Sequence, residues 1–120
     1  MDKIIVSQAR LAARIGVTEE ERSREQELVV DVELLADTRE SARTDDLRHS
    51  IDYAAVHAAL AETARAAPVA LVEALAQRMA DALLERFPAR EVRVLVRKPG
   101  ALQAQGAAWA GVEITRRRDG

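Results

Sequence analysis

The sequence predicts an α+β fold in which a four-stranded antiparallel sheet carries two helices on one face. Two segments with the two-residue period of strands precede the middle of the chain, and two follow it. The middle has apolar residues at three- and four-residue spacing, which is the period of helices. Apart from this helical pair, the connections between strands look like hairpins. The order β-β-α-α-β-β therefore differs from the β-α-β-β-α-β order of ferredoxin-like folds.

The first half of the chain contributes two strands and a charged connection. We expect strands at Lys3–Ile15, ended by Gly16, and at Glu27–Ala36. Residues 18–26 between them read TEEERSREQ, which is too charged for a core. A solvent-facing loop, or one helical turn capped by Thr18, is expected there. The second strand has an apolar face and an acidic face, so one side of the sheet is expected to be wet.

Two helices are expected after a polar, turn-like stretch at Thr38–Asp46. The first begins near Tyr53 and ends at about Ala66, with Ser50 or Asp52 as its cap. The second is expected at Leu71–Phe87. Prolines bracket it, and its apolar stripe consists of Leu71, Leu75, Met79 and Leu83.

The last two strands are expected at Glu91–Lys98 and Gly111–Arg117. Valines alternate with other residues in the first of them, which predicts one buried face. Lys98 stands at its end and is followed at once by a Pro-Gly pair that stops the strand. A rigid scaffold can aim such a side chain into a cleft.

Composition limits the class of protein. At 120 residues we expect one domain, 1–120, with an aliphatic core, because 48% of residues are hydrophobic and only three are aromatic. No apolar run approaches a membrane span, and the first residues lack a signal pattern, so we expect no membrane association. The chain has no cysteine, which fits a cytoplasmic protein, and its net charge of −2 gives no general attraction to nucleic acid.

The chain lacks the residues and motifs that several kinds of catalysis require. The chain has two histidines and no thiolate, so we expect no metal site and no cysteine nucleophile. No G-x-S-x-G, P-loop or dinucleotide motif is present, and no cofactor is expected.

Four polar side chains remain as candidates, each with a simpler alternative. Lys98 is a solvated strand-end charge or a positioned amine. Tyr53 fills the core or donates a proton. Glu73 complements the dipole at a helix start, or accepts hydrogen bonds from a ligand. Glu21 is a solvated acid or part of a site. The residues taken singly leave these alternatives open.

Four segments in register resemble the dihydroneopterin aldolase family from about Lys3 to Ile114. They are IGVTEEERSREQELVVDVEL, ARTDDLRHSIDYAAV, ALVEALAQRMADALLERFP and VRVLVRKPGAL. The resemblance implies the tunnelling fold. It also implies a homo-oligomeric ring, a tetramer or octamer, with active sites between subunits. Open sheet edges agree with such assembly.

The resemblance also implies roles for the candidates. Lys98 matches the catalytic lysine that moves a proton, and Tyr53 matches the tyrosine that assists at the substrate. Glu73, with the backbone of Val72, matches the group that binds the amino-pyrimidine edge of a pterin. Glu21 matches an acid that reaches the substrate from a neighbouring subunit.

The implied reaction is retro-aldol cleavage of 7,8-dihydroneopterin in folate biosynthesis, without metal or Schiff base. Epimerisation at C2′ would follow if the products recombine. The alternatives are a dihydroneopterin triphosphate 2′-epimerase, a non-catalytic pterin-binding ring protein, and a nucleic-acid-binding module. The chain lacks the basic face that a nucleic-acid-binding module needs. Trp109 is unusual for the family, and we expect it to pack in an interface or cover the ligand.

Overall fold

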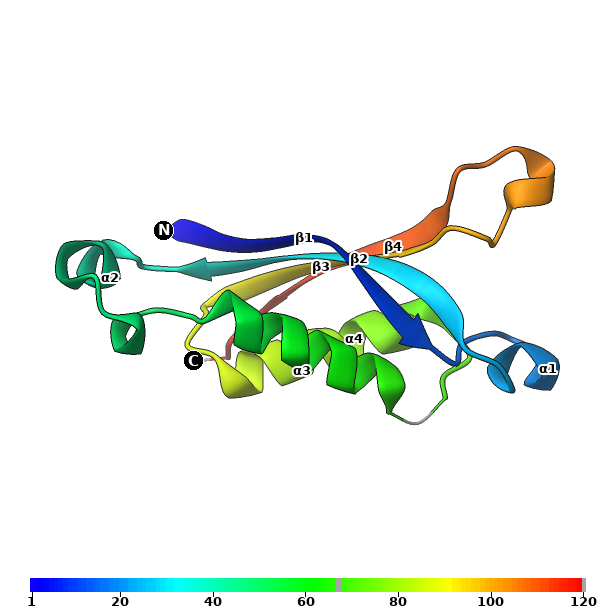
Figure 1. Cartoon of the computed structure of the whole chain (residues 1–120), viewed down its shortest axis with the longest axis horizontal. Coiled ribbons are helices and arrows are strands. Elements are labelled where there is room, and N and C mark those ends of the chain that lie inside the picture. Colours follow the sequence, from blue (N-terminus) through cyan, green and yellow to red (C-terminus); the bar gives the residue numbers. More distant parts are fainter. Residues whose placement is uncertain (67, 120) are drawn as a thin grey trace.

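Four strands form one antiparallel sheet in the order β1-β2-β3-β4. The structure is a computed structural model that describes residues 1–66 and 68–119. The strands are β1 (Asp2–Ala13), β2 (Gln26–Ala36), β3 (Glu91–Lys98) and β4 (Ala110–Arg117). The molecule is elongated along the strands, with extents of 50 × 28 × 25 Å (Figure 1).

The strand register defines two ends of the sheet. At one end Ala13 pairs with Gln26, and Lys98 pairs with Ala110. We call this the Lys98 end. At the other end Asp2 pairs with Ala36 and Glu91 pairs with Arg117, and we call it the Tyr53 end. Helix α1 and the β3–β4 loop project beyond the Lys98 end, and α2 projects beyond the Tyr53 end (Figure 1).

Two helices cover one face of the sheet, as the sequence predicts. Helix α3 (Tyr53–Arg65) packs beneath β1, and α4 (Val72–Arg86) packs beneath β3 and β4 (Figure 1). The predicted valine face of β3 is confirmed, because Val92, Val94 and Val96 are fully buried. The α+β architecture and its element order are therefore confirmed.

Local signals in the sequence set the helix boundaries. The Asp52 carboxylate caps α3 by accepting a hydrogen bond from the Ala54 N–H at 2.9 Å. Asp52 is one of the two caps that the sequence predicts. Helix α4 starts shortly after Val69, whose backbone pairs with Ile15 in an isolated parallel bridge, and it ends before Pro88. This bridge also explains why β1 ends at Ala13 and not at Ile15.

Four short helical turns lie in the connections between the strands and the two long helices. Helix α1 (Glu19–Arg22) is the single turn capped by Thr18, one of the two predicted alternatives. Helix α2 (Arg39–Thr44) lies within Thr38–Asp46, the stretch predicted only as a polar turn, and the 3₁₀ turn η1 (Leu47–His49) follows that stretch. Asp45 separates them with a left-handed backbone, φ 54°, and Asp46 then caps η1. A further 3₁₀ turn, η2 (Gln103–Gln105), lies in the β3–β4 loop.

No helix in the described ranges combines the length and the apolar character that crossing a bilayer requires.

Candidate active site

Lys98 ends the row of residues that faces the core. Side chains alternate along a strand, so Lys98 follows Val92, Val94 and Val96 on the helix-facing side of β3. Its side chain is only 17% exposed. The ammonium Nζ lies 3.4 Å from Oε2 of Glu21, a residue of α1. The predicted strand-end lysine is therefore neither core nor fully solvated, and it has a carboxylate partner in its own chain.

Thr18 fixes the Glu21 carboxylate in a capping box. The Thr18 N–H and hydroxyl donate to Glu21 Oε1 at 3.2 and 3.0 Å, and the Glu21 N–H donates to Thr18 Oγ1 at 3.1 Å. These Thr18 hydrogen bonds, and then that of Lys98, lower the pKa of Glu21 below its usual value. The carboxylate thus remains ionised and faces the Lys98 ammonium.

Gly16 holds α1 close to the end of the sheet. Its φ is +159°, and a Cβ atom at this position would lie 2.2 Å from the Cβ of Glu21. The Gly16 N–H donates to the Val69 carbonyl at 3.1 Å, and the Val69 N–H donates to the Arg14 carbonyl at 3.2 Å. The segment that leads into α4 is therefore tied to the segment that leads into α1.

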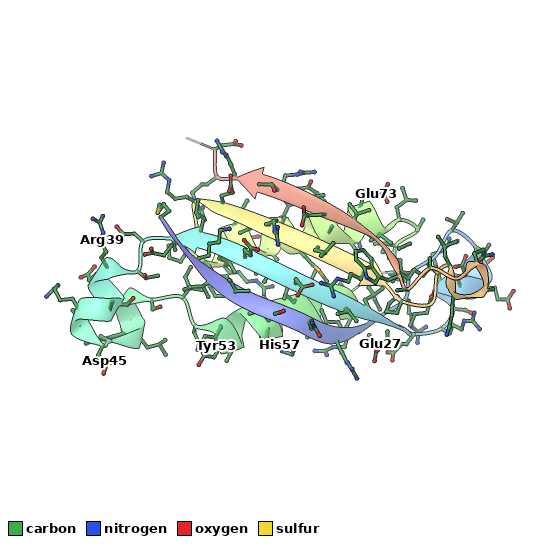
Figure 2. All side chains as sticks on the ribbon, turned by 90° about the horizontal axis from the view of Figure 1, so that it is seen from above. Glu27, Arg39, Asp45, Tyr53, His57 and Glu73 are labelled. Atoms are coloured by element: carbon green, nitrogen blue, oxygen red, sulfur yellow. The ribbon has the colours of Figure 1, made fainter. Side chains whose placement is uncertain are left out.

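Val72 and Glu73 begin α4 close to this tie. The cap residue Leu71 makes no side-chain hydrogen bond to the helix, so α4 starts without a side-chain cap. Glu73 is exposed, and its carboxylate makes no hydrogen bond or ion pair with another described residue. Glu73 and Tyr53 lie toward opposite ends of the sheet (Figure 2).

Tyr53 lies at the other end, in a cleft. It is the first residue of α3 and is 70% exposed. The cleft has a volume of about 720 Å³, and its wall includes Ile4, Leu47 and Ile51. Ile4 pairs with Leu34, whereas Arg97 pairs with Val29, so the cleft and the end of β3 are about 17 Å apart along β2. Tyr53 and Lys98 of one chain therefore belong to separate regions.

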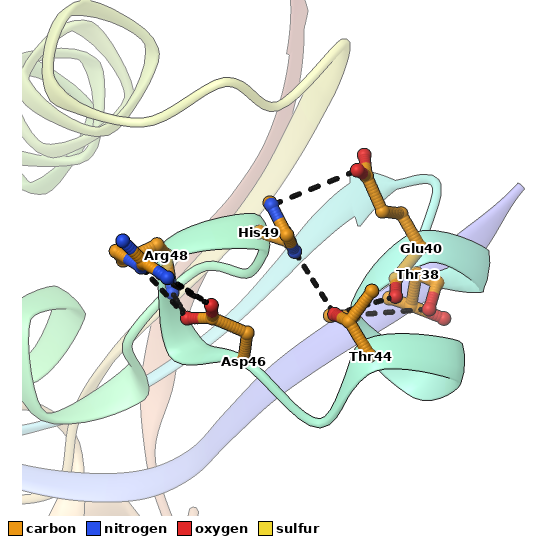
Figure 3. A network of polar contacts seen from close by, with 7 residues as sticks. Thr38, Glu40, Thr44, Asp46, Arg48 and His49 are labelled. Carbon is orange, nitrogen blue, oxygen red and sulfur yellow. Dashed lines mark hydrogen bonds and ion pairs between the residues drawn. The ribbon is translucent and has the colours of Figure 1, made fainter.

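A polar network lies in α2 and η1, two elements that supply part of the wall of this cleft (Figure 3). His49 Nδ1 lies 2.9 Å from the Thr44 hydroxyl, and His49 Nε2 lies 3.6 Å from Glu40 Oε1. Asp46 accepts two-pronged hydrogen bonds from the Arg48 guanidinium, which lower the pKa of Asp46. These contacts order α2 and η1, the elements that precede Tyr53.

Within residues 1–66 and 68–119, no group of three or more His, Asp or Glu side chains is arranged to hold a metal ion.

The structure brings together some of the predicted site residues. Lys98 and Glu21 are in contact, and Val72 and Glu73 begin the helix that starts at the same end, whereas Tyr53 lies apart. The resemblance implies that Glu21 reaches over from a neighbouring subunit, yet here Glu21 already contacts Lys98 of its own chain. The partnership of Thr18 with Glu21 was missed, although the T-x-x-E spacing of a capping box signals it.

The fold and the half-buried ammonium–carboxylate pair define a small α+β protein with a candidate acid–base site at one end of its sheet. The family model for dihydroneopterin aldolase matches residues 4–115. Dihydroneopterin aldolase of Escherichia coli strain K12 is 37% identical over 116 residues, which are 97% of this chain and 93% of that protein. This chain therefore belongs to the dihydroneopterin aldolase family.

Solved structures agree with this assignment. The E. coli dihydroneopterin aldolase in complex with neopterin superposes with a TM-score of 0.91 at 37% identity, over 97% of this chain and 99% of that one. A putative dihydroneopterin aldolase from Vibrio cholerae gives 0.93 at 35% identity, over 98% of both chains. Uricase from Arthrobacter globiformis, at 15% identity and a TM-score of 0.53 over 98% of this chain and 47% of that one, shares the fold alone. The predicted tunnelling fold is confirmed, and ring assembly stays a prediction.

Proposed function

We propose that this chain cleaves 7,8-dihydroneopterin into 6-hydroxymethyl-7,8-dihydropterin and glycolaldehyde. The observation that carries this proposal is the Lys98–Glu21 pair, an amine and a carboxylate held 3.4 Å apart in a half-buried position. The family relationship supports the reaction, and the neopterin complex of the E. coli relative supports a pterin ligand. The cytoplasmic location expected from the sequence stays a prediction.

The reaction needs proton transfers that such a pair can provide. A base takes the proton of the 2′-hydroxyl, C2′ becomes the aldehyde carbon of glycolaldehyde, and the C1′–C2′ bond breaks. The electron pair enters the C=N bond of the dihydropterin ring, and the resulting enol is protonated at C1′. We assign the movement of these protons to Lys98, assisted by Tyr53. A general acid–base group contributes about 10²- to 10⁴-fold.

Glu21 serves this chemistry by holding Lys98. The Thr18 hydrogen bonds keep the carboxylate ionised and oriented before any substrate arrives. An ionised partner within hydrogen-bonding distance fixes the direction of the amine. Glu21 also lies close enough to the ammonium to face a substrate bound against it, in line with the substrate-binding role that the resemblance implies.

The start of α4 would hold the pterin ring. Glu73 presents a carboxylate that has no partner among the described residues, and two acceptor oxygens match the adjacent N–H and NH₂ groups of an amino-pyrimidine. The uncapped first turn also leaves backbone groups available at Val72. Together they form a polar edge suited to one edge of a flat heterocycle.

We further propose that a second copy of the chain supplies Tyr53. The roughly 17 Å between the cleft and the end of β3 supports this, because one chain brings no tyrosine to Lys98. Exposed apolar residues at both ends offer surface to bury, with Val17 and Leu71 at the Lys98 end and Leu47 at the Tyr53 end. Contact between unlike ends is head-to-tail, and it gives a ring when the rotation from copy to copy closes. The number of subunits, four or eight, stays a prediction.

The test is release of glycolaldehyde from 7,8-dihydroneopterin by the purified protein. The wild type should release it, and Lys98→Ala should lose most turnover while still binding pterin. Arg93→Ala is a matched control, because Arg93 is on the same strand and carries ion pairs remote from Lys98. Inversion at C2′ without glycolaldehyde would sink the lyase proposal in favour of an epimerase, and pterin binding without turnover would favour a binding protein.

A further inference from the structure

Arg97, the residue before Lys98, is held on the opposite face of the sheet. Its Nη2 lies 2.5 Å from Oδ2 of Asp31, and its guanidinium stacks over the ring of Trp109 at 5.2 Å from the centroid. The Arg97 side chain is 24% exposed and that of Asp31 is 13% exposed. Partial burial reduces the screening of this charge by solvent and salt.

Asp31 is itself fixed from the other side. Its Oδ1 accepts hydrogen bonds from the Ser7 hydroxyl at 3.0 Å and from the Gln8 N–H at 2.8 Å. These contacts fall where β1 bulges, with Gln8 at φ 55° and a register shift between Val6 and Ala9. The acceptor that meets Arg97 is therefore already oriented by two other donors.

Trp109 closes the mouth of the β3–β4 hairpin. The hydrogen bonds found within the described loop are local, from Ala101 to Lys98 and within residues 102–107. Trp109 directly precedes Ala110, which pairs with Lys98, and Gly111 pairs with Arg97. A Cβ atom at Gly111 would lie 2.3 Å from the Val96 carbonyl oxygen, so β4 starts very close to β3. The ring thus anchors an exposed loop to Arg97, the strand neighbour of Lys98.

We propose that Trp109, through Arg97 and Asp31, is a positioning residue that directs Lys98 toward Glu21. The Trp109–Arg97–Asp31 row is called the back clamp below. Consecutive residues of a strand share a planar peptide, so fixing the Arg97 side chain on one face fixes the direction of Lys98 on the other. This role rests on the proposed function of Lys98, and the expectation that Trp109 packs in an interface or covers the ligand stays a prediction.

Fluorescence tests the back clamp without any substrate. Trp109 is the single tryptophan of the chain, so its emission reports the ring's surroundings directly. Arg97→Gln should shift the emission to longer wavelength and increase quenching by acrylamide. Arg93→Gln is the matched control, since Arg93 lies on the same face of β3 and pairs with Glu33 and Glu113. Equal emission from wild type and Arg97→Gln would overturn the clamp.

Kinetics tests the positioning role. In Trp109→Ala we expect kcat for glycolaldehyde release to fall about tenfold, because small displacements of a catalytic group slow a reaction severely. KM should stay within about twofold, because the ring-binding groups on α4 are untouched. Trp109→Phe keeps an aromatic face over Arg97 and should restore kcat to within about twofold of wild type.

The outcomes separate this role from a structural one and from the proposed function. A structural role would lower the thermal midpoint of Trp109→Ala and leave kcat per folded enzyme unchanged, which would overturn the positioning role alone. If Trp109→Ala turns over at the wild-type rate, the positioning role is overturned as well. A wild type that releases no glycolaldehyde would overturn the proposed function, and the positioning role with it.

Discussion

The two ends of the sheet hold their polar groups in opposite states. At the Lys98 end, an ammonium 17% exposed meets a carboxylate of the same chain, and Thr18 and Gly16 fix that carboxylate from behind. At the Tyr53 end, a phenol 70% exposed lines an open cleft. One chain therefore orders the amine–carboxylate pair by itself, whereas its tyrosine faces outward toward whatever occupies the cleft.

This difference means that one end of the site is preorganised within a single chain, whereas the other end depends on assembly with a second copy. Groups that are oriented before the substrate binds need no reorganisation during the reaction. The Lys98 end has this property within a monomer, and the Tyr53 end contributes only after a second copy docks in the proposed arrangement. Folding would then govern one half of the site and subunit association the other half.

Mixing inactive variants tests this division most strongly. Lys98→Ala and Tyr53→Phe should each lose about 10²- to 10⁴-fold in kcat, the range of a general acid–base group. Refolded together in equal amounts, they should regain about a quarter of wild-type activity, because one head-to-tail interface in about four joins an intact Lys98 to an intact Tyr53. Glycolaldehyde release before and after mixing measures the gain.

The matched control mixes Lys98→Ala with Glu21→Gln. Lys98 and Glu21 lie at the same end of one chain, and each variant lacks one of them. No site in this mixture therefore contains an intact Lys98–Glu21 pair. We expect no regain. Activity from this control, or none from the first mixture, contradicts the division of the site between two chains.

Glu73→Gln probes ligand binding at the Lys98 end. A hydrogen bond to a charged group contributes about 1.5 to 3 kcal/mol, so pterin affinity should weaken about 10- to 100-fold. Titration of pterin fluorescence measures the dissociation constant, and kcat should change less than affinity. Glu85→Gln, an exposed carboxylate on the same helix, is the control and should bind normally. Equal affinities of the two variants argue against the role assigned to Glu73.

Gly16→Ala tests how tightly the Lys98 end is packed. The added Cβ would overlap the Cβ of Glu21 at 2.2 Å, and overpacking of this kind costs about 1 to 3 kcal/mol of the free energy of unfolding. Gly100→Ala is the control, because a Cβ there meets nothing within 4 Å. Denaturant unfolding compares the two, and unchanged stability of Gly16→Ala rules out the close approach.

Thr18→Ala gives the smallest expected effect, about 1 kcal/mol from the lost helix cap. Because Thr18 and Lys98 hold the pKa of Glu21 low, the ionised carboxylate stabilises the fold above its unfolded pKa, and this contribution is lost as pH falls through the folded pKa. Without the Thr18 hydroxyl, the pKa of Glu21 should rise and the loss should begin at higher pH.

The measurement for Thr18→Ala is an NMR titration of Glu21 Cδ together with unfolding at several pH values. Thr18→Ser keeps the hydroxyl and should titrate like wild type. A pKa that is the same in Thr18→Ala and wild type shows that the Thr18 hydroxyl does not set the ionisation of Glu21.

Local periodicity made most of the fold predictable. The valines of β3 and the prolines around α4 fixed element type and limits, because strand alternation and helix breaking act over a few residues. Helix α2 was not predicted, because its end depends on the left-handed conformation of Asp45, which composition does not reveal. The separation of Tyr53 from Lys98 was also hidden, since it depends on strand register across β1, β2 and β3.

The position of Lys98 at the end of a row of valines constrains which insertions and deletions β3 can accept. Inserting or deleting one residue within β3 would turn Lys98 to the other face of the sheet, away from Glu21. Substitutions among the valines keep the alternation, whereas odd length changes reverse it. Relatives of this chain are therefore expected to differ in which residues lead to this lysine. Their strands should differ in length here only by an even number of residues.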